Sequence, residues 1–119
     1  MKIHKEPPAN NTDFKLFIAM IDFKLPKGYL DFMKSSNGVE IELDNDFIIL
    51  HPLTELFELN NAYNIDELLP GFFIIGSNGS ENAYAVEKQS GKIFKFPMIG
   101  LDEDTLEYVC DDFEDLLNE

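Results

Sequence analysis

Apolar positions are densest in the second half of the chain. Residues 72–75 are four apolar residues in a row, which predicts a buried strand, and the GSNG of residues 76–79, from Gly76 on, predicts the turn that ends it. Apolar positions at residues 84–87 and 93–96 predict two further strands, separated by Ser90-Gly91. Connections this short force neighbouring strands to run antiparallel. A central β-meander is therefore predicted.

Helical spacing of apolar residues marks two segments before residue 36. After Thr12, a suitable N-cap, apolar residues recur at i, i+3, i+4 and i+7; they are Phe14, Phe17, Ile18 and Ile21. A second helix is predicted with Pro26 in its first turn and with Asn37-Gly38 at its left-handed C-terminus. Its predicted buried residues are Leu25, Tyr29, Phe32 and Met33. Residues 1–11, which contain Pro7-Pro8, are expected to be a flexible arm.

Between these helices and the meander, the pattern predicts a hairpin and a third helix. Residues 39–43 alternate apolar with acidic, as a strand with one wet face does, and residues 47–50 return after a turn at 44–46. His51-Pro52 then opens a helix with inward-facing Leu53, Leu56 and Phe57, which Asn60-Asn61 closes. Residues 62–68 are expected to be a loop.

The acidic tail from Asp102 to Glu119 fits two patterns. One is a single amphipathic helix with six apolar residues on one face: Leu106, Val109, Cys110, Phe113, Leu116 and Leu117. The other is a short strand in which Leu106, Tyr108 and Cys110 alternate, followed by a helix from Phe113 that Asp111 or Asp112 caps. The second is preferred, because a single helix would align acidic side chains and place late carboxylates against the helix dipole.

Length and composition favour one domain of residues 1–119 in a reducing compartment. The 119 residues include eleven Phe and four Tyr, enough to build a core without disulfides. A single cysteine, Cys110, cannot form an internal disulfide, and no export signal begins the chain. No apolar run is long enough to span a bilayer. We therefore expect a cytoplasmic protein.

The charge is strongly negative and unevenly distributed. All nine basic residues are Lys, against 23 acidic residues, for a net charge of −14. Residues 1–34 carry six Lys and four acids, whereas residues 35–119 carry three Lys and nineteen acids. Such a field repels nucleic acid and anionic lipid and attracts a basic protein. The alternative is that the acidity serves solubility alone.

Candidate chemistry is sparse. The GSNG of residues 76–79 is followed by a strand and not by the helix that a phosphate-binding loop needs. His4 and His51 have no ligand partners at metal-binding spacing, and Asp44 and Asp46 lack the Gly and Glu of an EF-hand. Cys110 lies among acids, which raise a thiol pKa. No enzymatic activity, cofactor or metal is predicted.

Several segments together resemble the SUKH superfamily, which includes the yeast cell-wall glucan-synthesis regulator and many bacterial immunity proteins. The resemblance covers residues 8–117, with two departures: Val39 replaces a frequent Gly, and Asp112 replaces a frequent Ser. The matching segments are Leu25-Pro26 with Tyr29 and Phe32, Asn37-Gly38, the FIIGSN of residues 73–78, Tyr84-Ala85-Val86, Gly91 with Ile93-Phe94, and Asp112-Phe113 with Leu116-Leu117.

The resemblance implies an α+β fold, with helices packed on a mostly antiparallel sheet, and a non-enzymatic role. Bacterial relatives are similar to proteins that bind and neutralise toxins, often nucleases. We therefore expect an immunity protein that binds a basic toxin domain; the alternative is a regulatory or scaffolding module with an endogenous partner. The acids predicted to contact the partner lie in turns and on the wet strand: Glu40, Glu42, Asp44, Asp46, Glu81, Asp102, Glu103 and Asp104.

Overall fold

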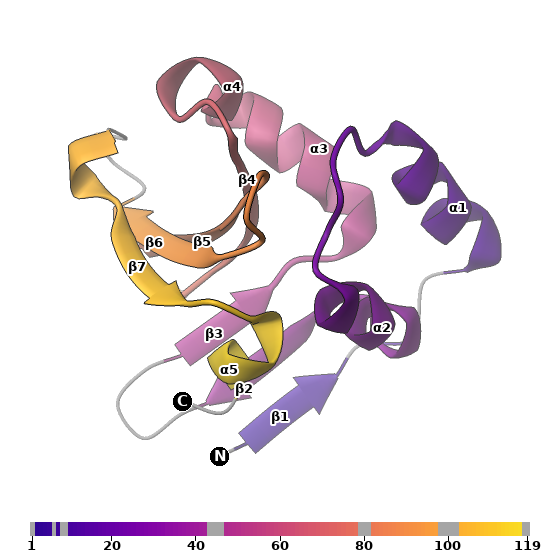
Figure 1. Cartoon of the computed structure of the whole chain (residues 1–119). Helices are drawn as coiled ribbons and strands as arrows, with labels where there is room; N and C mark the ends of the chain where they lie inside the picture. The colour runs from indigo at the N-terminus through magenta and orange to yellow at the C-terminus, as the bar shows by residue number, and fades with distance from the viewer. Residues whose placement is uncertain are drawn as a thin grey trace.

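The computed structural model describes residues 2–5, 7, 10–42, 47–78, 82–97 and 103–117. Within these residues, seven strands form one antiparallel sheet, and each strand pairs with its neighbour in the chain (Figure 1). The strands are β1 (Lys2–Lys5), β2 (Val39–Glu42), β3 (Phe47–Leu50), β4 (Phe72–Ser77), β5 (Asn82–Glu87), β6 (Ile93–Pro97) and β7 (Glu107–Cys110). The prediction of an α+β fold with a central meander is confirmed.

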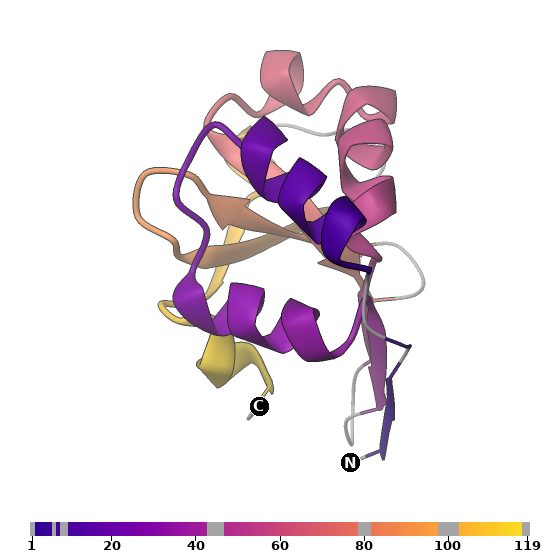
Figure 2. The same ribbon diagram turned by 90° about the vertical axis from the view of Figure 1, so that its right-hand side faces the viewer.

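Helices lie between these strands and after the last one. They are α1 (Asn11–Met20), α2 (Lys27–Ser35), α3 (Leu53–Ala62), α4 (Ile65–Leu68) and α5 (Phe113–Leu117), with a 3₁₀ turn, η1 (Glu103–Thr105), before β7. Figure 2, turned by 90° from Figure 1, shows α1, α2 and α3 together on one side of the molecule.

Both faces of the sheet are covered where β4 to β6 lie. One face packs against α1, α2, α3 and α5 in the larger core, which includes Phe17, Tyr29 and Phe113. The opposite face of β4 to β6 packs against α4 in a smaller core around Ile65 and Phe96. Every residue of β4 is therefore buried, which explains its continuous apolar sequence. In β2, by contrast, only alternate residues are buried.

The turn predicted at residues 76–79 starts too early in the chain, because β4 continues past Ile75. Gly76 lies within β4, which continues to Ser77 and pairs there with β3. A Cβ on Gly76 would lie 2.2 Å from the carbonyl oxygen of Ile49. The glycine thus serves a close backbone approach, and it adjoins a register shift between Ile74 and Gly76.

The N-terminal region differs from the expected arm. Residues Lys2–Lys5 form the edge strand β1, which pairs with β2. The first helix is capped by Asn10, whose side-chain oxygen accepts a hydrogen bond from the backbone N–H of Asp13 at 2.8 Å, and not by Thr12. The sequence pattern could not predict that β1 is a strand, because its partner β2 is more than thirty residues away in the chain.

Asn60 was predicted to close the third helix. It instead lies buried within α3. Its amide donates to the carbonyl oxygens of Leu56 (2.8 Å) and Ile74 (3.1 Å), and its side-chain oxygen accepts from the N–H of Ile74 (2.7 Å). Because β3 pairs with only the last residues of β4, this side chain satisfies backbone groups of β4 that no strand reaches. The expected loop at residues 62–68 contains α4.

Asn37 and Gly38 connect α2 to two other parts of the chain. Helix α2 ends at Ser35, and Gly38 has a φ of +110°, so the left-handed residue lies beyond the helix terminus and not at it. The side-chain oxygen of Asn37 accepts a hydrogen bond from the N–H of Leu53 at 2.8 Å, which satisfies a donor at the start of α3. The two-residue motif therefore joins α2, β2 and α3.

The predicted division of the acidic tail into strand and helix is confirmed. Strand β7 ends at Cys110 and α5 begins at Phe113. The ring of Phe113 packs edge-on against Tyr29, with a centroid separation of 5.3 Å, and lies 5.8 Å from the ring of Phe32. These contacts hold α5 against α2.

Candidate functional site

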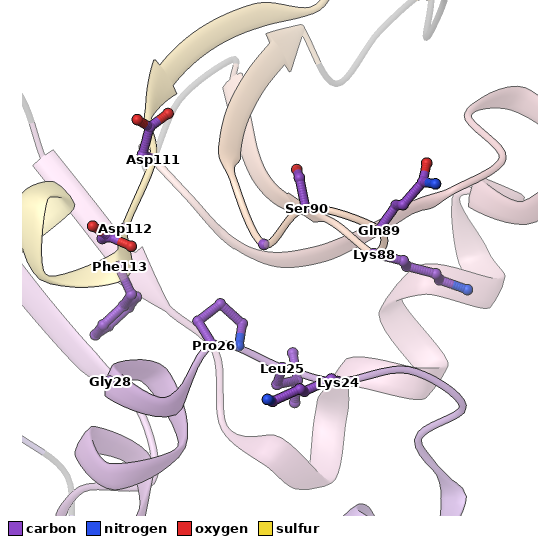
Figure 3. A pocket seen from close by; sticks show the side chains of 11 residues that line it. Lys24, Leu25, Pro26, Gly28, Lys88, Gln89, Ser90, Asp111, Asp112 and Phe113 are labelled. Atoms are coloured by element: carbon purple, nitrogen blue, oxygen red, sulfur yellow. The ribbon is translucent and has the colours of Figure 1, made fainter.

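A cleft of about 430 Å³ opens where three connections of the fold meet. The β5–β6 turn contributes residues 88–91, the link into α2 contributes residues 24–26 and 28, and the β7–α5 junction contributes residues 111–113. Figure 3 shows Asp111 and Asp112 along one side, with Ser90 and Gln89 across from them. The cleft walls are therefore polar and include two adjacent carboxylates.

The β5–β6 turn is held in place by local hydrogen bonds. Gly91 has a φ of +79°, and its N–H donates to the carbonyl oxygen of Glu87 at 2.8 Å. The hydroxyl of Ser90 donates to the Glu87 carboxylate at 2.5 Å and accepts from the N–H of Lys92. The turn is a fixed wall of the cleft, built by a glycine that tolerates this backbone conformation.

The ammonium group of Lys88 makes its ionic and aromatic contacts outside the cleft. Its ammonium nitrogen lies 3.6 Å from a carboxylate oxygen of Asp22 and 3.9 Å from one of Asp66, and it sits 5.3 Å from the ring centroid of Phe23. In Figure 3 its side chain extends away from Asp111 and Asp112. Lys88 therefore does not neutralise the acidic wall; the nearby lysines are Lys92, which pairs with Asp111, and Lys24, which also lines the cleft.

The β7 edge beside the cleft carries an exposed aromatic ring. Phe72, Phe94 and Tyr108 form a series of edge-to-face contacts across the sheet, with centroid separations of 5.4 and 5.9 Å. Phe72 is buried, but Tyr108 at the end of the series is 53% exposed. Strand β7 pairs with β6 on one side only. No other described strand pairs with its second edge, which can therefore accept a further strand.

Acidic groups surround Tyr108. Its hydroxyl donates to the Asp111 carboxylate at 2.5 Å, and this hydrogen bond, aided by nearby negative charge, raises the pKa of Tyr108 to about 12. Asp111 also lies 4.0 Å from the ammonium of Lys92, and Glu107 lies 3.9 Å from that of Lys95. The hydrogen bond ties the phenol ring to Asp111, which lines the cleft.

Four residues that carry the sequence resemblance line this cleft: Leu25, Pro26, Gly91 and Phe113. They are far apart in the chain and meet only in the fold. A family model described as the SMI1/KNR4 family (SUKH-1) matches residues 8–119. The chain belongs to this family. Comparison with curated proteins finds no significant match.

The other motif residues of this SUKH-1 chain have structural roles. Tyr29 and Tyr84 are fully buried, and Phe32 packs against Phe113. Gly76 permits the close approach of β3 to β4. The family is consistent with a protein-interaction domain of the immunity or regulator type. Among the described helices, none has the length and apolar character that crossing a membrane requires.

Of the acids predicted to contact a partner, those in the described part of the chain lie on two separate elements, β2 and η1. Glu40 and Glu42 are exposed on β2, where the register sets them opposite His4 and Lys2. Asp104 is exposed in η1, before β7. The backbone of Glu103 lies in the same turn. Four predicted residues lie outside the described part of the chain: Asp44, Asp46, Glu81 and Asp102.

Sequence reasoning missed the side chains that the structure brings together. Tyr108, Asp111 and Asp112 were assigned to a strand and a helix cap and not to an interaction surface. The available signal was an aromatic residue at an exposed strand position, followed by two acids at the end of that strand. Without the neighbouring strand and turn, that signal cannot be separated from ordinary surface polarity.

The polar groups available at the cleft include the carboxylates of Asp111 and Asp112, the hydroxyl of Ser90 and the ammonium group of Lys24. Within the described residues, no three side chains of the metal-binding types gather at one place. The thiol of Cys110 is buried and donates to the backbone oxygen of Asp112 at 3.3 Å. Two carboxylates, an aromatic ring and an open strand edge can together receive a cationic, extended protein segment.

Proposed function

We propose that this SUKH-1 protein is a cytoplasmic immunity protein. It binds a basic toxin domain, a nuclease, without catalysis, and the β7 edge with the adjoining cleft is its contact surface. Nucleases must carry Lys and Arg to bind phosphate backbones, so an inhibitor with complementary charge associates rapidly.

The observation that carries the proposal is the excess of acid around an exposed tyrosine. The three Lys of residues 35–119 all take part in ion pairs, with Asp22, Asp66, Asp111 or Glu107 as partners. Nineteen acids occupy the same part of the sequence. Tyr108 adds the rigid aromatic side chain that protein interfaces favour.

The strand edge suggests how the toxin would dock. An extended segment of the toxin would pair with β7 through main-chain hydrogen bonds, and its Lys or Arg side chains would lie over Tyr108 and against Asp111 and Asp112. The fixed turn at Ser90-Gly91 and the α5 junction would shape the cleft around one such side chain.

The test uses the protein encoded next to this chain's gene, if its C-terminal domain is basic. That domain is expressed with and without this chain, growth is measured, and binding of the purified pair is followed by surface plasmon resonance, which gives both the association rate and the Kd. We expect growth to be restored, and the association rate to fall several-fold as salt is raised from about 50 to 200 mM, since screening weakens steering. Enzymatic turnover of a small molecule by this chain would contradict the proposal.

Variants locate the contact surface. Tyr108→Ala and Asp112→Lys should each raise the Kd about 10-fold or more, because one removes the aromatic contact and the other reverses a charge. Glu58→Lys is the matched control; Glu58 is exposed on α3 and does not line the cleft. If Glu58→Lys weakened binding as much as Asp112→Lys, the contact surface would be wrong. Binding to an endogenous protein with no effect on toxicity would favour the regulatory role.

A further inference from the structure

The second half of α1 exposes large apolar side chains. Of residues 14–20, with the sequence FKLFIAM, only Lys15 is polar, and Phe17 is the residue of α1 that is fully buried. Leu16, Ile18 and Met20 are 55%, 39% and 61% exposed. Large apolar side chains that gather on a helix surface are normally covered by another element or by a partner. In Figure 2, α1 lies toward the viewer between α2 and α3, with its outer side uncovered by any other described element.

A groove continues this surface. It has a volume of about 550 Å³ and lies beside α1 and α2. Its apolar lining residues are Phe14, Ile18, Ile21, Phe23, Leu25 and Leu30, and its charged ones are Lys24, Asp31 and Lys34. Ile18 lines the groove, and the exposed Ala19 lies between Ile18 and the pair Leu16 and Met20 around the end of α1. The groove and this end of the helix are together called the α1 patch. Contiguous apolar surfaces of this kind mark interaction sites.

The distribution of charge indicates what covers the α1 patch. Residues 1–34 carry six Lys and four acids, whereas the rest of the chain carries sixteen more acids than Lys. Two copies repel each other wherever their acidic parts approach. They can meet through the first 34 residues without that repulsion. Charges of both signs, Lys24 and Lys34 with Asp31, line the groove, so the patch can complement itself across a two-fold axis.

We infer that the protein forms a homodimer through the α1 patch. The interface is isologous, with Leu16, Ile18 and Met20 of each copy against the same surface of the other. None of Leu16, Ile18 and Met20 lines the cleft, although the groove shares Lys24 and Leu25 with it, and the β7 edge stays free in the dimer to bind a partner. A helix of 10 residues is about 15 Å long, which gives an interface at the small end of the usual range and a concentration-dependent dimer.

Sedimentation equilibrium of the purified full chain tests the dimer without any toxin. Between about 1 μM and about 1 mM, the range in which a small interface dissociates, the mass should rise from 13.6 kDa toward twice that value. Leu16→Glu combined with Met20→Glu should raise the dimer Kd at least about 10-fold, because charges replace apolar contacts. Leu68→Glu is the matched control: Leu68 on α4 is 46% exposed but lies outside the patch.

A milder variant covers the case in which two added carboxylates unfold α1. Leu16→Ala with Met20→Ala preserves helix propensity, should keep the native circular dichroism spectrum, and should also weaken the dimer. A monomeric wild-type chain at the highest concentration would overturn the inference. So would an Ala variant that dimerises as tightly as wild type, or a Leu68→Glu variant that dimerises as poorly as the Leu16→Glu/Met20→Glu protein.

Discussion

At the scale of single residues, Tyr29 is the buried polar side chain without a compensating contact. Its ring lies in the larger core against Phe113, and its hydroxyl has no hydrogen-bond partner among the described residues. Burial accordingly raises the pKa of Tyr29 far above its ordinary value. An unpartnered buried hydroxyl costs free energy relative to its hydrated state in the unfolded chain.

Tyr29→Phe should therefore stabilise the protein. The substitution removes the hydroxyl and keeps the ring packed on Phe113, so the free energy of unfolding should rise by about 1 kcal/mol. Urea denaturation at neutral pH measures the change. Tyr63→Phe, at a half-buried position outside the larger core, serves as the comparison and should not stabilise to the same extent. A loss of stability in Tyr29→Phe would mean that the hydroxyl is compensated after all.

His51 gives stability a dependence on pH. Burial lowers the pKa of His51 from its ordinary 6.5, and the negative charge of Glu55 opposes part of this effect. The unfolded state then binds the proton more readily than the folded state. The contribution of His51 is fully present above pH 6.5 and is lost as pH falls through that value toward the folded-state pKa.

Compared with His51→Gln, the wild-type protein should lose more stability on going from about pH 8 to about pH 5.5, a range that brackets the ordinary histidine pKa. Urea midpoints at several pH values, taken as differences between the two proteins, isolate this residue. Glu55→Gln should steepen the loss, because it removes the charge that favours the protonated ring. Parallel pH profiles for wild type and His51→Gln would refute the assignment.

At the scale of secondary-structure elements, the approach of β3 to β4 depends on one glycine. A Cβ at position 76 would meet backbone, 2.2 Å from the Ile49 oxygen, and backbone cannot rotate away as a side chain can. Gly71 is a useful contrast, since its φ is +91° and no atom lies within 4 Å of its added Cβ. One position tests steric contact, and the other tests dihedral strain alone.

Gly76→Ala should lower the free energy of unfolding by about 2–4 kcal/mol, the range of severe overpacking. Gly71→Ala should cost only about 1–2 kcal/mol from the strained dihedral. Thermal and urea denaturation of both variants provide the comparison. Equal losses in the two variants would show that β3 and β4 separate easily at Gly76.

The sequence pattern identified most elements but not the contacts between distant ones. The apolar run of β4 and the alternation in β2 predicted these strands, because each pattern reports burial at its own position. Strand β1 was missed, and Asn60 was assigned to a helix end, because each role depends on a partner remote in sequence. For the same reason the cleft could not be predicted: Pro26, Gly91 and Asp112 come from three connections that meet only in the fold.

At the scale of the whole molecule, net charge should make stability depend on salt. The chain carries −14 at pH 7, and the few ion pairs among the described residues involve exposed carboxylates, which contribute little each. Self-repulsion of the excess acid therefore destabilises the folded state more than the expanded one. Added salt screens this repulsion.

The urea midpoint at pH 7.5 should accordingly rise when NaCl increases from about 10 to about 500 mM, which shortens the screening length several-fold. KCl at the same ionic strength should act equally, because the effect is one of screening and not of specific ion binding. The rise should be smaller for a variant with several exposed acids changed to Lys. A midpoint that falls with salt would show that attractive pairs outweigh repulsion.

The order of the strands in the sheet also bears on synthesis. Because each of the seven strands pairs with its neighbour in the chain, every strand from β3 onward finds its first partner among residues that the ribosome has already released. Only β1 has to wait, through α1 and α2, until β2 emerges. The nascent polypeptide can thus build its sheet vectorially, one hairpin at a time.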